Sequence, residues 1–268
     1  MCPACRAFIS ASDRVCPYCE SALEPPRRPS VSSFESSFHL RFASTLIMLI
    51  NLGIYVATAL YSMKSSVGSF ASLDAETLYL FGAKYGPAIR AGEWWRLVTA
   101  GFLHGGLLHI LMNSWALFSL TTEVEALFGT RRFLVMYFFC IVAGFAASTW
   151  WSPALSIGSS PGILGLLGVL IATLTRNRSG LGQVMRQQYI LWAVYGVAIG
   201  FLPGLAIDNA AHLGGLGAGL AAGFLIAPSQ SRWPTTERLW TLAAAMCILL
   251  TVLAFLAMVM QFVSRTAG

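Results

Sequence analysis

Long apolar runs, each about the length needed to cross a membrane, dominate this 268-residue chain. A helix crosses a hydrocarbon core of ~30 Å with roughly 20 residues. We therefore expect seven spanning helices, at 42–63, 104–128, 133–151, 156–175, 188–202, 209–228 and 239–263. The fifth is expected to be the shortest, because Pro203 and Gly204 end its apolar run early. The pattern predicts an all-α polytopic membrane protein.

Composition and charge support this class and suggest an orientation. Hydrophobic residues make up 56% of the chain and charged residues 10%, against about 25% charged in ordinary soluble domains. With the N-terminus in the cytoplasm, that side would hold 12 of the 17 Lys and Arg residues, as the positive-inside rule favours. The net charge of +6 then faces anionic lipid headgroups, and nucleic-acid binding is not expected. We expect a multi-pass protein of a bacterial inner membrane, inserted by its first helix.

The residues before the first apolar run form a different module. Positions 1–24 contain two CxxC pairs separated by ten residues: Cys2 and Cys5, then Cys16 and Cys19. This spacing is typical of a zinc ribbon, in which four thiolates hold one structural Zn²⁺. A pair of disulfides and a redox CxxC are the alternatives, and a cytoplasmic location disfavours lasting disulfides. Positions 25–41, rich in Pro and Ser, are expected to be a flexible linker.

Polar side chains inside three of the apolar runs are the candidate site. His109 and Asn113 are one helical turn apart, Ser160 lies near the start of the fourth run, and His212 lies near the start of the sixth. A polar group in hydrocarbon costs free energy, so such residues commonly mark function. The alternative is that they glue the helices together by hydrogen bonds, or that the serine bonds its own backbone.

The residue types suit nucleophilic catalysis. A serine hydroxyl attacks a carbonyl when a base removes its proton and donors receive the oxyanion. Ser160 is the candidate nucleophile, His212 the base, and His109 with Asn113 the donors. Asp208 lies four residues before His212, and a helix-capping role for Asp208 or Asn209 is favoured over orientation of the base by Asp208. No metal or other cofactor is expected for this chemistry.

Between the first two runs, positions 64–103 are too broken to cross a membrane and too apolar for a free loop. We expect this segment to lie partly in the interface, with Trp94 and Trp95 at headgroup depth and Arg96 reaching outward.

These motifs resemble rhomboid intramembrane serine proteases. The resemblance covers about 42–228 and rests on Gly92-Glu93-Trp94-Trp95-Arg96-Leu97-Val98-Thr99, on His104 to Gly106 with His109 and Asn113, on Gly158-Ser159-Ser160, and on Ala211-His212-Leu213-Gly214-Gly215. It implies a six-helix core at 42–228, with 229–268 adding a linker and a seventh helix. It also implies peptide-bond hydrolysis by a Ser160–His212 dyad. His109, Asn113 and the N–H of Ser160 would form the oxyanion hole, and Glu125 would be a structural partner inside the bundle.

Two positions depart from the family pattern. Pro161 stands where the family's nucleophile motif ends in glycine, and it brings no N–H, although its fixed φ suits a first helical turn. Leu164 replaces the aromatic residue against which the family's base stacks. These departures predict lowered activity. Ser159 is a rival nucleophile, which the register of the following residues disfavours.

The expected partners are transmembrane protein substrates and the lipid bilayer. The alternative function is a catalytically weak or inactive rhomboid-like protein that binds membrane clients without cutting them. A transporter with a proton-relay histidine is disfavoured, because the spanning acids Glu123 and Glu125 lie near the cytoplasmic end. The zinc ribbon is compatible with client recognition, oligomerisation or regulation, each of which would involve a protein partner.

Overall fold

The computed structural model forms two compact units, Met1–His39 and Leu40–Gly268. It describes Cys2, Cys5, Phe8 and 15–22 of the first unit, and 42–64, 68–176, 179–202, 206–226 and 234–266 of the second. The expected linker at 25–41 lies outside the described residues, and the expected domain boundaries stay predictions.

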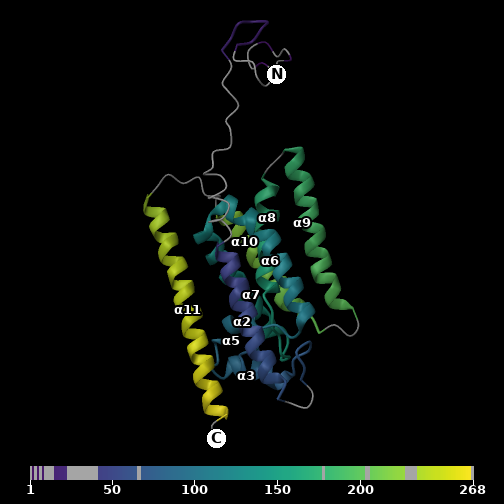
Figure 1. Ribbon diagram of the computed structural model, residues 1–268, viewed down its shortest axis with the longest axis vertical. Coiled ribbons are helices and arrows are strands. Elements are labelled where there is room, and N and C mark those ends of the chain that lie inside the picture. The colour runs from purple at the N-terminus through teal and green to yellow at the C-terminus, as the bar shows by residue number, and fades with distance from the viewer. Residues whose placement is uncertain are drawn as a thin grey trace. The chain divides into compact units, whose positions relative to one another are not determined.

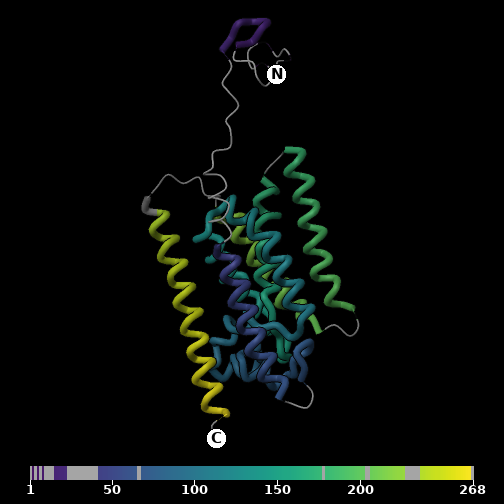
Figure 2. The backbone as a smooth tube through the Cα atoms, in the orientation of Figure 1, coloured from purple at the N-terminus to yellow at the C-terminus, as the bar shows by residue number. Residues whose placement is uncertain are grey.

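The described part of the second unit is helical (Figure 1). Its long helices are α2 (Phe42–Ser62), α6 (Leu107–Phe128), α7 (Thr130–Trp151), α8 (Ser160–Thr175), α9 (Gly180–Ala198), α10 (Asn209–Leu225) and α11 (Pro234–Thr266). Figures 1 and 2 show α9 and α11 on opposite sides of the bundle, with the other long helices between them. This is the all-α polytopic architecture that the sequence predicts.

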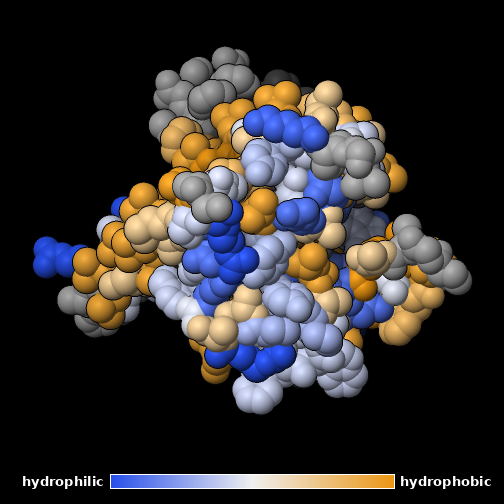
Figure 3. Space-filling model, turned by 90° about the horizontal axis from the view of Figure 1, so that it is seen from below, coloured by the Kyte–Doolittle hydropathy of each residue, from blue (hydrophilic) through white to orange (hydrophobic). Residues whose placement is uncertain are grey.

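Length and hydropathy alone single out three of the described helices as able to cross a membrane: α2, α7 and α11. Helix α8 is apolar but has 16 residues, and α6 has 22 but carries His109, Asn113 and two glutamates. The outer faces of the bundle are apolar, with Leu49 of α2, Leu191 of α9 and Leu256 of α11 about half exposed. At the end of the bundle seen in Figure 3, hydrophilic residues extend from the middle to the lower edge, and hydrophobic residues lie mainly along the other sides.

The fifth helix is longer than predicted. Helix α9 begins at Gly180, eight residues before the expected start at 188, and has 19 residues, so α8 with 16 is shorter. Ser179 caps its N-terminus by accepting a hydrogen bond from the N–H of Gly182 at 3.1 Å. Hydropathy finds the apolar part of a helix, whereas the cap sets where the helix begins.

Glycines allow α8 and α10 to pack backbone against backbone. A Cβ on Gly223 would lie 2.6 Å from the carbonyl oxygen of Val169, and one on Gly219 would overlap the carbonyl oxygen of Gly165. Such small-residue faces let helices approach closely in lipid. Nearer the helix starts, a Cβ on Gly215 would overlap the carbonyl oxygen of Pro161, so the start of α10 is also held against the start of α8.

The Gly219→Ala variant is expected to be less stable by ~1–3 kcal/mol, because the new methyl group must push two helix backbones apart. Gly217→Ala is the matched control, since a Cβ there meets nothing within 4 Å. The control should be neutral or slightly stabilising, as alanine favours helix over glycine. Thermal unfolding in detergent compares the two, and equal melting temperatures would refute the close packing.

The segment between α2 and α6 is anchored to the C-terminal end of α7. It contains α3 (Ala75–Leu80), α4 (Gly86–Arg90), α5 (Arg96–Thr99) and the 3₁₀ turn η1 (Ala100–Phe102). The buried Lys84 donates from Nζ to the carbonyl oxygens of Ser152 at 2.7 Å and Ala154 at 3.2 Å, and Arg90 donates to that of Thr149 at 2.9 Å. Helix ends leave such carbonyls unpaired and partially negative, so two cations suit them. Burial lowers the pKa of Lys84.

Arg96 corrects one expectation from the sequence, because it is fully buried and does not reach outward. Its guanidinium carbon lies 4.2 Å from the ring centre of Tyr79 and 4.5 Å from that of Trp95. The guanidinium pairs with Glu93 at 2.5 Å and donates to the carbonyl oxygens of Tyr79 and Ala83. A planar guanidinium can be buried when its donors are satisfied and its faces stack on aromatic rings. Trp95 is buried with it, whereas Trp94 is half exposed.

Helix α11 is fastened near both of its ends. Near its C-terminus, Gln261 and Arg265 donate to Oε1 of Glu93 at 3.2 and 3.0 Å. Near its N-terminus, Glu237 pairs with Arg132 of α7 at 2.7 Å. The seventh helix therefore belongs to the folded unit and holds the segment that carries Arg96.

Candidate active site

Ser160 and His212 meet at the N-terminal ends of α8 and α10. Nε2 of His212 lies 2.7 Å from Oγ of Ser160. Gly158 makes the turn into α8 with a φ of +115°, a backbone conformation that residues with a side chain rarely adopt. Asp208 caps α10 by accepting from the N–H of Ala211 at 3.0 Å, as predicted, and also accepts from Ser148 Oγ. Two helix starts thus present a nucleophile and a base within hydrogen-bond distance.

A backbone carbonyl holds the other side of the His212 ring. Nδ1 of His212 lies 3.0 Å from the carbonyl oxygen of Gly196 in the last turn of α9. A carbonyl oxygen accepts only, so this contact requires the proton on Nδ1 and leaves the lone pair of Nε2 for the hydroxyl of Ser160. The carbonyls of a last helical turn have no intrahelical donor, which leaves this one available.

His109 and Asn113 line the same place from α6. Asn113 donates from Nδ2 to the carbonyl oxygen of His109 at 2.9 Å, and its Oδ1 accepts from Ser159 Oγ at 3.2 Å. Nδ1 of His109 accepts from the N–H of Gly105 at 3.4 Å, which leaves Nε2 as the ring donor. A Cβ on Gly158 would lie 2.7 Å from this Nε2 and 3.7 Å from Ser160 Oγ. The imidazole donor therefore faces the turn that carries the serine.

The two departures from the family pattern fit the local structure. Pro161 occupies the first turn of α8, where an N–H has no intrahelical acceptor and a fixed φ is tolerated. Its ring packs on Gly144 of α7, where an added Cβ would approach the Pro161 Cβ to 2.6 Å. Leu164 is buried, and its side chain lies against Gly196, the residue whose carbonyl contacts His212. The residue that replaces the aromatic side chain thus supports the histidine's acceptor.

The structure brings Ser160, His212, His109 and Asn113 together, while their catalytic roles stay predictions. Sequence reasoning missed Gly196, because a backbone carbonyl carries no residue-type signal. It also missed the contacts of Ser159, which is fully buried and points toward α6. Glu125 is buried within α6, and the structural partnership that the resemblance implies stays a prediction.

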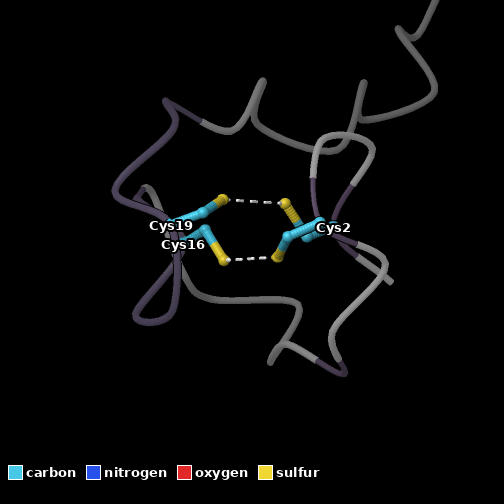
Figure 4. Close-up of side chains that lie close together, drawn as sticks. Cys2, Cys16 and Cys19 are labelled. Carbon is cyan, nitrogen blue, oxygen red and sulfur yellow. Dashed lines mark hydrogen bonds between the residues drawn. The ribbon is translucent and has the colours of Figure 1, made fainter.

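The four N-terminal cysteines form a second candidate site. Their sulfur atoms all lie within 4.8 Å of one another, with Cys2 and Cys19 at 3.6 Å and Cys5 and Cys16 at 3.7 Å (Figure 4). Four sulfurs bound tetrahedrally at about 2.3 Å from Zn²⁺ lie roughly 3.8 Å apart, so the spacing fits a metal. It is too long for disulfides, whose sulfurs lie about 2 Å apart. Hydrogen bonds from the side chain and backbone of Ser21 lower the pKa of Cys19, which favours the thiolate.

Comparisons with known proteins point to one family. The model of the Rhomboid domain family matches residues 91–229. The chain is 39% identical over 151 residues to "Rhomboid protease GluP" of Bacillus subtilis (strain 168), covering 56% of this chain and 30% of that protein. It is 34% identical over 151 residues to "Rhomboid-like protease 3" of Toxoplasma gondii, covering 55% and 57%. It is 29% identical over 182 residues to "Putative rhomboid protease YdcA" of Bacillus subtilis (strain 168), covering 66% and 91%. The chain thus spans less than two thirds of the length of the first two relatives.

Proposed function

This chain belongs to the rhomboid family, and on that basis we propose that it is a serine endopeptidase that hydrolyses peptide bonds in or near transmembrane segments of membrane proteins. Relatives named as proteases support the activity. The observation that carries the assignment of residues is the 2.7 Å separation between Ser160 Oγ and His212 Nε2. The substrates are transmembrane proteins, which the protein would bind within the lipid bilayer. By the positive-inside argument, we place the N-terminus in the cytoplasm. The compact architecture suits a bacterial inner membrane, and we propose that location.

The first half of the reaction is acyl transfer to Ser160. Its Oγ attacks the scissile carbonyl carbon as the hydroxyl proton passes to Nε2 of His212. The imidazolium still donates its Nδ1–H to the carbonyl oxygen of Gly196. The partially negative C-terminal end of α9 stabilises the positive charge of the ring. His212 then returns the proton to the leaving amine, and the C–N bond breaks to give an acyl-enzyme. Gly196 thereby supplies the orienting acceptor that an aspartate supplies in a Ser-His-Asp triad.

Water completes the cycle with the same groups. His212 takes a proton from a water molecule, whose oxygen attacks the ester carbon of the acyl-enzyme. The tetrahedral intermediate collapses with release of the carboxylic acid, and the proton returns to Oγ of Ser160.

The donors for the tetrahedral oxyanion are His109 Nε2–H, an N–H of Asn113 and the backbone N–H of Ser160. The first turn of α8 adds a favourable dipole for the negative charge. The contact of His109 Nδ1 with the N–H of Gly105 supports Nε2 as the protonated nitrogen. Pro161 removes a fourth donor that a glycine there would offer, which is the physical reason to expect a lower rate than in relatives with the glycine.

The His109→Ala variant is expected to lower kcat by about 10²–10³-fold while KM changes little, because an oxyanion donor acts mainly in the transition state. Steady-state cleavage of a membrane-spanning fluorogenic substrate measures both constants. Leu108→Ala, at the exposed neighbouring position, is the matched control and should leave both unchanged. A rise in KM alone would assign His109 to substrate binding instead.

Reconstitution in liposomes with a panel of single-span proteins tests the function itself. We expect the wild-type protein to cut spans that contain helix-weakening residues near small side chains, and the Ser160→Ala variant to leave them intact. Pro161 favours one other candidate, a rhomboid-like protein that binds membrane clients without cutting them. Co-purification of intact clients with the wild-type protein, without any cleavage product, would establish that alternative.

For the first unit we propose a zinc ribbon in which Cys2, Cys5, Cys16 and Cys19 hold one structural Zn²⁺. The support is the spacing of the four sulfur atoms and the two CxxC pairs. A module of this size buries little apolar surface, so its fold depends on the metal. The ribbon has no part in the hydrolysis and offers a surface for a protein partner.

A further inference from the structure

Ser159 precedes the nucleophile and is fully buried. It occupies the N-cap position of α8, yet among the described residues its side chain accepts no capping hydrogen bond, and its backbone is in the αR region. An N-cap serine normally has extended backbone and accepts from the N–H two or three residues on. The hydroxyl of Ser159 therefore does not cap α8 and makes its hydrogen bonds elsewhere.

The hydroxyl faces the side chains of Asn113 and His104, which precede it by about fifty residues, and Tyr137 of α7 is a third neighbour. Ser159 Oγ donates to Oδ1 of Asn113 at 3.2 Å, and Nε2 of the fully buried His104 lies 3.5 Å from the same Oγ. When the hydroxyl gives its single proton to Asn113, it is free to accept from Nε2–H of His104. With His104 as the Nε2–H tautomer, these contacts form a directed chain from His104 through Ser159 to Asn113.

This chain determines how the Asn113 amide is oriented. One Nδ2 hydrogen is donated to the carbonyl oxygen of His109, and Oδ1 is held by Ser159. With both ends of a planar amide engaged, the direction of the second Nδ2 hydrogen is set. The terminal torsion of asparagine is otherwise broad, so an amide without the Ser159 contact would turn more freely.

We propose that Ser159 is a positioning residue for the oxyanion hole: its hydroxyl, supported by His104, holds the Asn113 amide so that its second N–H faces the carbonyl oxygen that Ser160 attacks. The inference rests on the proposed protease function. It gives the rival serine of the GSSP motif a role that does not require it to act as a nucleophile.

A double-mutant cycle tests the proposal in the full-length protein. Ser159→Ala, Asn113→Ala and the double variant are compared with wild type for kcat and KM on a fluorogenic transmembrane substrate. We expect Ser159→Ala to lower kcat by about tenfold, the worth of roughly one hydrogen bond, with KM little changed. Adding Ser159→Ala to Asn113→Ala should then cost almost nothing more, because both changes remove the same donor.

Two further variants serve as controls for the loss of a nearby hydroxyl and for a change in side-chain size at position 159. Ser119→Ala removes an exposed hydroxyl that bonds the Trp115 carbonyl on the same helix as Asn113, and it should leave kcat unchanged. Ser159→Cys keeps the size of the side chain but donates weakly, so it should lower kcat without loss of thermal stability. It replaces Ser159→Ala in the cycle should that variant fail to fold.

The outcomes separate the inference from the function on which it rests. A normal kcat in both Ser159 variants, or effects that multiply with Asn113→Ala, would overturn the positioning role and leave the protease function intact. A wild-type protein that neither cleaves substrate nor labels Ser160 with a fluorophosphonate would overturn the function, and the positioning role with it.

Discussion

The His212→Ala variant is expected to lose at least about 10³-fold in kcat, and up to about 10⁶-fold, because the proposed nucleophile and its proposed base would act as a unit. Without the imidazole, the hydroxyl of Ser160 keeps its proton at neutral pH and cannot attack a carbonyl efficiently. The 2.7 Å contact between His212 and Ser160 is the structural reason to expect so large a loss. Single-turnover cleavage in detergent measures it, over a long time course for the variant.

The matched control is Leu213→Ala, at the exposed next position of α10. It should cleave as the wild type does. Thermal unfolding of both variants checks that the bundle remains folded, since His212 is buried and also bonds α9. A folded His212→Ala variant that cleaves within tenfold of wild type would show that another group acts as the base.

Removing the proposed metal from the first unit is expected to unfold that unit and leave the second unchanged. A strong chelator should make residues 1–24 sensitive to proteolysis, whereas the thermal unfolding of the helical unit should not shift, because the chain divides into two compact units at His39. Mass spectrometry of the native protein should find one Zn²⁺ per chain, and Cys16→Ser should abolish its retention. The matched control, Cys247→Ser in α11, should keep the metal.

A protein that contains no metal and whose intact mass is four hydrogen atoms below that of the fully reduced chain would contradict the zinc ribbon. It would indicate two disulfides. The sulfur separations of 3.6 and 3.7 Å argue against that result.

The helical framework follows from the sequence, because hydrocarbon imposes long apolar runs and intrahelical hydrogen bonds. The limits of this reasoning are visible at α9 and at Arg96. Helix α9 starts outside its apolar run, directly after the capping residue Ser179. Hydropathy does not detect the part of a helix that continues beyond the apolar run. Arg96 is buried because distant residues, among them Tyr79 and Ala83, satisfy and stack on it.

In the candidate site, too, some groups could be predicted from the sequence and others could not. The four side chains proposed for catalysis are polar groups in apolar runs. Because a polar group in hydrocarbon costs free energy, such residues can be recognised in the sequence. The Gly196 carbonyl is invisible to such reasoning, because every residue has one and only the end of α9 makes this one available. Ser159 was visible only as a rival nucleophile, since its role depends on the fold of α6 against the start of α8.

The measurement that tests the account most directly is fluorophosphonate labelling of the detergent-purified protein, with the labelled residue identified by mass spectrometry. We predict a single modified serine, Ser160. We also predict that labelling vanishes in Ser160→Ala and His212→Ala and persists, more slowly, in Ser159→Ala. Modification of Ser159, or a folded wild-type protein that takes up no label, would contradict the Ser160–His212 dyad.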